Sequence, residues 1–153
     1  MEADLRQLFD REFDGMVALA RAVSNDPGEV EDIVMDAFLE TGRRFSTLSN
    51  PGGYLRTSVI NGARRRYRNS ANRKSIVTRF AGSLAQDDEP EVHENYITDL
   101  LGSLPEAQHT TLVLLYYVGL TQAEAAEIMG CPVGTVKSHA HRALKSLRQQ
   151  VLA

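Results

Sequence analysis

Cationic and hydrogen-bonding side chains gather on one face of a helix predicted near the end of the chain. This helix runs from Pro132 to about Arg148, and its polar face carries Thr135, Lys137, Ser138, His141, Arg142 and Lys145. Such groups hydrogen-bond to base edges and neutralise phosphates, which a helix in the major groove of DNA must do. These side chains would bind DNA, and binding requires no covalent step. We therefore predict that residues 119–148 form a helix-turn-helix that reads duplex DNA.

The residues before this helix have the types that a tight helix-helix turn requires. Thr121 and Glu124 show the spacing of a capping box for a short helix. Gly130 tolerates the positive φ of the turn, and Pro132 can begin the next helix. The buried face of that helix is predicted to be Val136, Ala140, Ala143, Leu144 and Leu147. The alternative, a helical hairpin with a merely solvated face, is disfavoured because cap, turn and basic face coincide.

A second cationic segment lies in the first half of the chain. Residues 41–80 hold ten basic and no acidic residues, and residues 1–40 hold eleven acidic and three basic ones, although the net charge is only −3. One-sided charge predicts a surface for a polyanion and a different partner for the acidic part. Ser49 and Asn50 lie in the loop before this segment, and Tyr54 and Tyr67 are suited to stacking on exposed bases. The basic residues of the predicted nucleic-acid contact are Arg56, Arg64, Arg65, Arg66, Arg68, Arg73 and Lys74. The alternative is a solvated helix end.

Helical periodicity runs through most of the chain, and no strand pattern persists. Asp26 is expected to cap a second helix, and residues 46–53 are predicted to be a loop before a helix from about Tyr54. Residues 70–95 lose the periodicity. The predicted fold class is all-α: two small helical domains, residues 1–75 and 96–153, joined by an acidic flexible linker, residues 76–95, with the helix-turn-helix in the second.

Several classes of protein are disfavoured by composition. No apolar run of about 18 residues predicts membrane insertion, and the acidic N-terminus is unlike a secretory signal. The single Cys131 excludes an internal disulfide and fits the cytoplasm. His139 and His141 lack a third ligand beside them, so no metal or cofactor is expected. No nucleophile–base pair or phosphate-cradling glycine loop indicates an enzyme, so no catalytic residue is predicted.

Many of these residues resemble the bacterial sigma factors of the sigma-70 family, in particular the short extracytoplasmic-function group. The likeness in residues 96–152 rests on Leu104-Pro105, Gly119-Leu120-Thr121, Glu124-Ala125-Ala126, Gly134-Thr135-Val136-Lys137-Ser138 and Arg142-Ala143. The likeness in residues 5–68 rests on Glu31-Asp32-Ile33-Val34, Ala37-Phe38-Leu39, Phe45, Tyr54-Leu55-Arg56 and Asn61. Met35, Tyr54 and His109 stand where the family usually has glutamine, tryptophan and arginine.

The resemblance implies a sigma factor that binds core RNA polymerase and promoter DNA and directs promoter-specific initiation. It assigns clamp binding to Glu31, Asp32, Met35 and Asp36. It assigns the melted −10 strand to Ser49, Asn50, Tyr54, Arg56, Asn61, Arg64 and Arg65, with an extruded base in the loop of residues 49–53. The polar face of the final helix would read the −35 element, and an anti-sigma factor is allowed as a further partner. The alternative is a stand-alone helix-turn-helix regulator that binds operator DNA.

Overall fold

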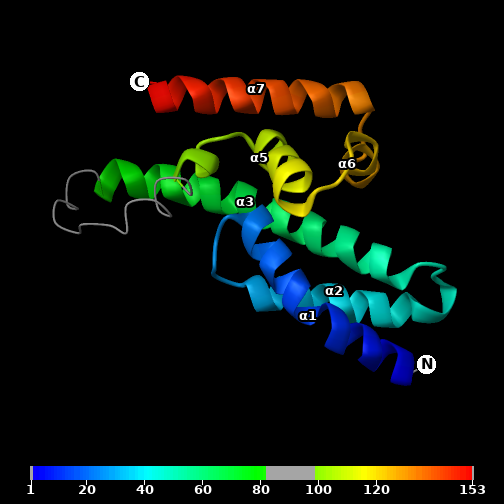
Figure 1. Cartoon of the computed structure of the whole chain (residues 1–153). Coiled ribbons are helices and arrows are strands. Elements are labelled where there is room, and N and C mark those ends of the chain that lie inside the picture. The colour runs from blue at the N-terminus through cyan, green and yellow to red at the C-terminus, as the bar shows by residue number, and fades with distance from the viewer. Residues whose placement is uncertain (1, 82–98, 153) are drawn as a thin grey trace. The chain divides into compact units, whose positions relative to one another are not determined.

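The computed structural model describes residues 2–81 and 99–152 of the chain, with side chains described outside residues 70–81. The described residues form helices and their connections, with no strand among them. The chain divides into two compact units, Met1–Tyr67 and Arg68–Ala153. The helices of both units are shown in Figure 1, and they confirm the predicted all-α class with two helical domains.

The first unit is built from α1 (Glu2–Ser24), α2 (Val30–Arg44), the short 3-10 helix η1 (Phe45–Thr47) and the start of α3 (Pro51–Ala81). α1 packs along α2. The rings of Phe9 and Phe38 lie 4.9 Å apart between these helices, and a Cβ at Gly42 would lie 3.2 Å from Leu5 Cδ2. The buried apolar residues of this unit include Leu8, Leu19, Val23, Val34, Phe38, Leu55, Val59, Ile60 and Ala63.

The turn between α1 and α2 differs from the prediction. Asp26 does not cap α2; the cap position is Glu29, which has a left-handed backbone (φ 63°) and makes no side-chain cap hydrogen bond. Instead, Asp26 Oδ1 accepts a hydrogen bond from the Gly28 N–H at 2.8 Å, which closes a turn within the connection. α2 begins at Val30, four residues after Asp26, so the cap position falls on Glu29.

α3 begins earlier and ends later than the sequence pattern predicted. Its first turn contains Pro51, Gly52 and Gly53, so the predicted loop ends at Asn50. Proline suits the first helical position because its missing N–H would be unpaired there. α3 then continues to Ala81, so residues 70–81 are helical although the sequence loses its apolar periodicity there. The rest of the predicted linker, residues 82–95, lies outside the described residues.

The second unit contains residues 99–102, which are helical, then α5 (Glu106–Leu112), the π-helix η2 (Val113–Val118), α6 (Gln122–Met129) and α7 (Val133–Leu152). α7 packs against α5 and α6. Leu104, Leu112 and Ala143 form a buried cluster, with Leu101 and Leu147 packed against it. η2 ends at Gly119, whose φ of 84° matches the predicted break.

Candidate nucleic-acid interface

α6 and the turn that follows it have the capping box and the turn glycine predicted for a helix-turn-helix. The Glu124 N–H donates to Thr121 Oγ1 at 3.1 Å, and the Thr121 N–H donates back to Glu124 Oε1 at 3.1 Å. Both bonds of the capping box are therefore present. Gly130 ends α6 with φ 67°, a conformation that a Cβ would strain. Ala125 and Ala126 are buried, as expected for small residues where α6 meets α7.

α7 separates a buried face from a polar one. Val136, Ala140 and Ala143 are buried, whereas Leu144, predicted to be buried, is 42% exposed. Leu144 adjoins Ala143, and it is Ala143 and Leu147 that occupy the contact with the core. Of the predicted DNA-contacting residues, Thr135 is half-buried and the others are exposed: Lys137, Ser138, His141, Arg142 and Lys145.

The exposed residues of α7 are spaced so that one helix face presents them together. Steps of three and four residues return to the same side of a helix, so Lys137, His141 and Lys145 align, with Ser138 and Arg142 beside them. Among the residues that the structure describes, no carboxylate forms an ion pair with Lys137, Arg142 or Lys145. The face can therefore offer three cations and a hydroxyl to a duplex.

The predicted −10 residues lie at the start and along the exposed side of α3. Ser49 and Asn50 are exposed just before the helix, and Arg65 is exposed along it. The other four are half-buried: Tyr54, Arg56, Asn61 and Arg64. Asn50 has a structural task as well, since its Oδ1 accepts a hydrogen bond from the Gly53 N–H at 3.1 Å and so caps α3. Since Gly52 and Gly53 are helical, the predicted base-holding loop of residues 49–53 is shortened to its first two residues.

The cap at Asn50 explains why Gly53 suits its position. A Cβ at residue 53 would lie 2.7 Å from Asn50 Nδ2, whereas one at residue 52 would lie 3.8 Å from Asn50 Oδ1, an ordinary contact. Alanine in place of a helical glycine otherwise stabilises by about 0.5–1 kcal/mol. We therefore expect Gly52→Ala to stabilise α3, and Gly53→Ala to leave it about 1 kcal/mol less stable than Gly52→Ala because the cap is displaced. Amide hydrogen exchange in the first turns of α3 measures both; equal protection would contradict the cap.

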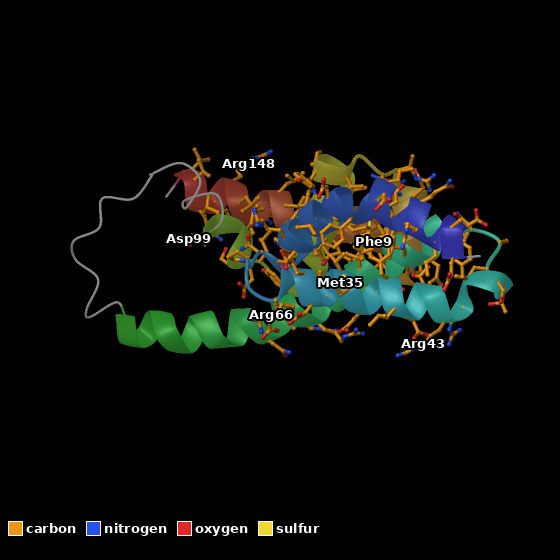
Figure 2. All side chains as sticks on the ribbon, turned by 90° about the horizontal axis from the view of Figure 1, so that it is seen from below. Phe9, Met35, Arg43, Arg66, Asp99 and Arg148 are labelled. Carbon is orange, nitrogen blue, oxygen red and sulfur yellow. The ribbon has the colours of Figure 1, made fainter. Side chains whose placement is uncertain are left out.

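Two residues of the basic segment, Arg66 and Tyr67, make contacts within the first unit that stabilise its fold. Tyr67 is only 3% exposed, so the prediction that it stacks on bases is wrong. The Arg66 guanidinium instead pairs with Asp26 at 3.2 Å and with Glu29 at 3.3 Å. In Figure 2, Arg66 lies on α3 close to the connection between α1 and α2. Arg66 therefore links α3 by ion pairs to the turn between α1 and α2, which lies forty residues earlier in the chain.

Because Arg66 forms these ion pairs, we expect its replacement to affect stability more than replacement of the neighbouring Arg65. The Arg66 and Asp26 side chains are 14% and 19% exposed, so removing the guanidinium leaves a largely buried carboxylate without this cation. We expect Arg66→Ala to lower the free energy of unfolding of the first unit by about 2 kcal/mol. The exposed Arg65 provides the matched control, and Arg65→Ala should change stability by less than about 0.5 kcal/mol. Urea-dependent hydrogen exchange in α1–α3 measures both variants, and equal losses would refute the assignment.

The residues predicted to bind polymerase lie on one exposed side of α2. Glu31, Asp32 and Asp36 are exposed, and Met35, labelled in Figure 2, is 40% exposed. Leu39 is 55% exposed and was not among the predicted contacts. Its spacing was a usable signal, because residues 31, 35 and 39 follow one another at four-residue steps along a single helix side. The face is therefore acidic with an apolar centre at Met35 and Leu39.

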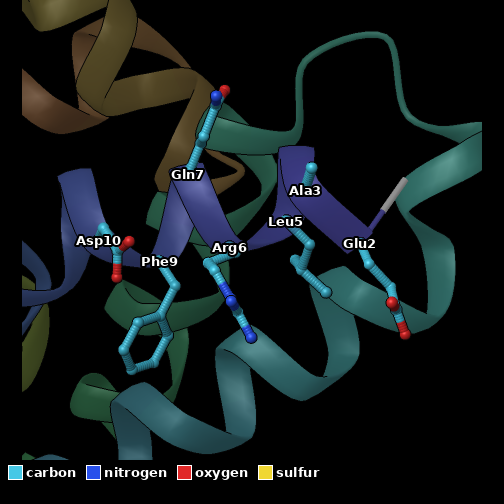
Figure 3. Close-up of a pocket in the computed structure, with 7 residues that line it drawn as sticks. All are labelled: Glu2, Ala3, Leu5, Arg6, Gln7, Phe9 and Asp10. Atoms are coloured by element: carbon cyan, nitrogen blue, oxygen red, sulfur yellow. The ribbon is translucent and has the colours of Figure 1, made fainter.

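A hollow lies along the first turns of α1 and is lined by Glu2, Ala3, Leu5, Arg6, Gln7, Phe9 and Asp10 (Figure 3). Leu5 and Phe9 point toward the ribbon of α2, and Gln7 points away from it.

Within residues 2–81 and 99–152, no group of three or more His, Cys, Asp or Glu side chains could hold a metal ion. No described helix is long and apolar enough to cross a membrane.

Comparison with known proteins finds similarity to RNA polymerase sigma factors. Residues 94–147 match the model of sigma-70, region 4. The chain is 29% identical over 145 residues to the RNA polymerase sigma-E factor of Streptomyces coelicolor, covering 92% of this chain and 81% of that protein. It is 24% identical over 153 residues to the ECF RNA polymerase sigma factor SigK of Mycobacterium sp. (strain KMS), covering 92% and 79%.

Two solved structures share the fold. CnrH in complex with the cytosolic domain of CnrY aligns with a TM-score of 0.71 at 21% identity, over 99% of this chain and 89% of that one. The sigma factor RpoE from Bartonella quintana, in complex with the anti-sigma factor NepR, aligns with a TM-score of 0.69 at 22% identity, over 98% of both chains. At these identities the likeness establishes the helical fold.

Proposed function

Because the chain belongs to the sigma-70 family of bacterial RNA polymerase sigma factors, we propose that it binds core RNA polymerase and directs promoter-specific initiation of transcription. The observation that carries this proposal is the polar face of α7. Its exposed cations and hydroxyl lie within the segment that matches sigma-70, region 4. In this proposal, Thr135, Lys137, Ser138, His141, Arg142 and Lys145 contact the −35 duplex.

The first unit supplies the other two contacts that initiation requires. The acidic side of α2, with Glu31, Asp32, Met35 and Asp36, binds the polymerase clamp, and Leu39 extends this face. The start and outer side of α3 hold the melted −10 strand through Ser49, Asn50, Tyr54, Arg56, Asn61, Arg64 and Arg65. Flipping a base out of a duplex costs about a few kcal/mol, so binding the unstacked form shifts the equilibrium toward strand separation without covalent chemistry.

Neither DNA contact is strong enough to act alone. α7 carries only four of the seventeen basic residues, and phosphate neutralisation supplies most of the affinity of such interfaces. Polymerase would hold both units against one promoter, so the second contact forms at a high effective concentration. This accounts for a protein with a net charge of −3 that nevertheless binds DNA.

A stand-alone helix-turn-helix regulator remains the second candidate, and its requirements differ. Such a protein binds operator DNA by itself, usually as a symmetric dimer that reads two half-sites. Such a regulator does not require the acidic and apolar face of α2, which lies far from the recognition helix in sequence.

The two solved structures named above are both complexes, one of them with an anti-sigma factor. We propose a protein antagonist of this kind as a further partner and the cytoplasm as the compartment.

Dependence on polymerase separates the two functions. The full chain is mixed with bacterial core RNA polymerase, and co-elution is measured by size-exclusion chromatography. Mobility shifts on a pool of promoter fragments are then compared with and without polymerase. The sigma function predicts co-elution, and sequence-specific shifts only when polymerase is present. Specific binding by the free chain, combined with no co-elution, would instead establish a stand-alone regulator.

A further inference from the structure

An apolar side chain is exposed at the start of α7. Val133, the first residue of this helix, is 39% exposed. It lies one helical turn before Lys137 and on the same side, because a step of four residues returns close to one direction. The neighbouring Gly134 leaves open space, since a Cβ there would meet nothing within 4 Å. Val133 was not among the residues predicted to bind DNA.

The packing of the second unit does not account for a valine at this position. The buried residues of α7 are Val136, Ala140 and Ala143, and the buried apolar cluster that Ala143 joins does not include Val133. A β-branched residue is also a weaker helix former than the straight-chain residues common on helix surfaces. The exposed part of Val133 is therefore available to a partner that approaches the first turn of α7.

The hydrogen-bonding groups near Val133 do not by themselves distinguish an A·T pair. α7 contains no Asp or Glu, and its two amide side chains, Gln149 and Gln150, lie at its far end. Amides read adenine and carboxylates read the amino group of cytosine in the major groove. A donor such as the Lys137 ammonium can bond to the acceptors of guanine or to O4 of thymine. The feature that identifies thymine to this face is therefore its 5-methyl group, which requires an apolar contact.

We propose that Val133 contacts the 5-methyl group of a thymine in the −35 duplex and makes binding specific for an A·T pair at that position. The first residues of a recognition helix are those that reach base edges, and Val133 begins α7. Contact between its γ-methyl groups and the thymine methyl removes apolar surface from water on both sides. The open space at Gly134 lets the duplex approach this turn closely. The inference rests on the proposed function, because it requires that α7 reads the −35 duplex.

The test uses the full chain with core polymerase and a promoter fragment that this complex shifts. Each thymine of the −35 element is replaced in turn by deoxyuridine, which removes only the 5-methyl group. We expect one position at which deoxyuridine weakens binding about fourfold, the effect of about one buried methyl group. Val133→Ala should weaken binding of the thymine fragment by a similar factor and bind the deoxyuridine fragment equally well, because the two methyl contacts are one interaction. Val133→Ile, which keeps a branched apolar side chain, should retain the preference for thymine.

Val151→Ala is the matched control, because Val151 is an exposed valine on the same side of α7, about five helical turns further along. It should keep the thymine preference and change affinity by less than about twofold. Equal binding of the thymine and deoxyuridine forms at every position would overturn the inference. A thymine preference that persists in Val133→Ala, or a −35 element without an A·T pair, would also overturn it. If no promoter fragment were shifted even with polymerase, the sigma function itself would be wrong, and the inference with it.

Discussion

Replacing Asp32 by arginine is expected to weaken binding to core RNA polymerase by at least about tenfold, equivalent to about 1.4 kcal/mol. Asp32 is exposed in the first turn of α2, where its side chain carries no contact of the hydrophobic core. A cation there would meet the basic clamp surface that the proposed function requires, and like charges across an interface repel strongly. Fluorescence anisotropy of the labelled chain, titrated with core polymerase, measures the change.

Asp14→Arg is the matched control for this charge reversal. Asp14 is an exposed acid on α1, so the substitution changes net charge by the same amount on a neighbouring helix. It should bind polymerase within about threefold of the unaltered chain, since distant exposed charges are screened by salt. Equal weakening by both variants would indicate general attraction between a negative protein and a positive one. Full binding by Asp32→Arg would remove α2 from the polymerase interface.

Replacing Arg142 by alanine is expected to lower the affinity of the polymerase complex for promoter DNA about tenfold and to reduce the slope of log affinity against log salt by about one. Arg142 is exposed on the polar face of α7 without an ion-pair partner among the described residues, so its cation is available for phosphate or guanine. Binding of a fragment containing the −35 element, measured over a series of salt concentrations, gives both quantities.

Arg148→Ala is the control on the same helix. Arg148 is also exposed, but it lies six residues further toward the end of α7, beyond the residues that we propose to contact the groove. It should leave affinity within about threefold and the salt slope nearly unchanged. If both arginines contributed equally, α7 would lie along the phosphate backbone, and the proposed groove contact would be wrong.

The helix-turn-helix was predictable because its determinants are local. A capping box, a turn glycine and a helix with separated faces each involve residues within a few positions of one another, and all three appear in the structure. The failure at Leu144 has a simple cause. Periodicity indicates an approximate direction, whereas the packing of Ala143 and Leu147 against the core decides which flanking residue is left at the edge.

The first unit was less predictable because its decisive contacts are distant in sequence. Arg66 and Tyr67 were interpreted as part of a cationic and aromatic surface, but Arg66 pairs with Asp26 and Tyr67 joins the core. The start of α3 was missed for another reason. Proline and two glycines usually break helices, yet proline at the first helical position and an asparagine cap are compatible with a helix start.

Transcription in vitro tests the central claim most directly. Bacterial core RNA polymerase is incubated with a library of promoter fragments, with and without the full chain, and the 5′ ends of the transcripts are mapped. A sigma factor predicts transcripts that begin at defined positions, that require the chain, and that share upstream elements at the −10 and −35 spacing. Co-elution with polymerase but no chain-dependent start site in the library would contradict the account.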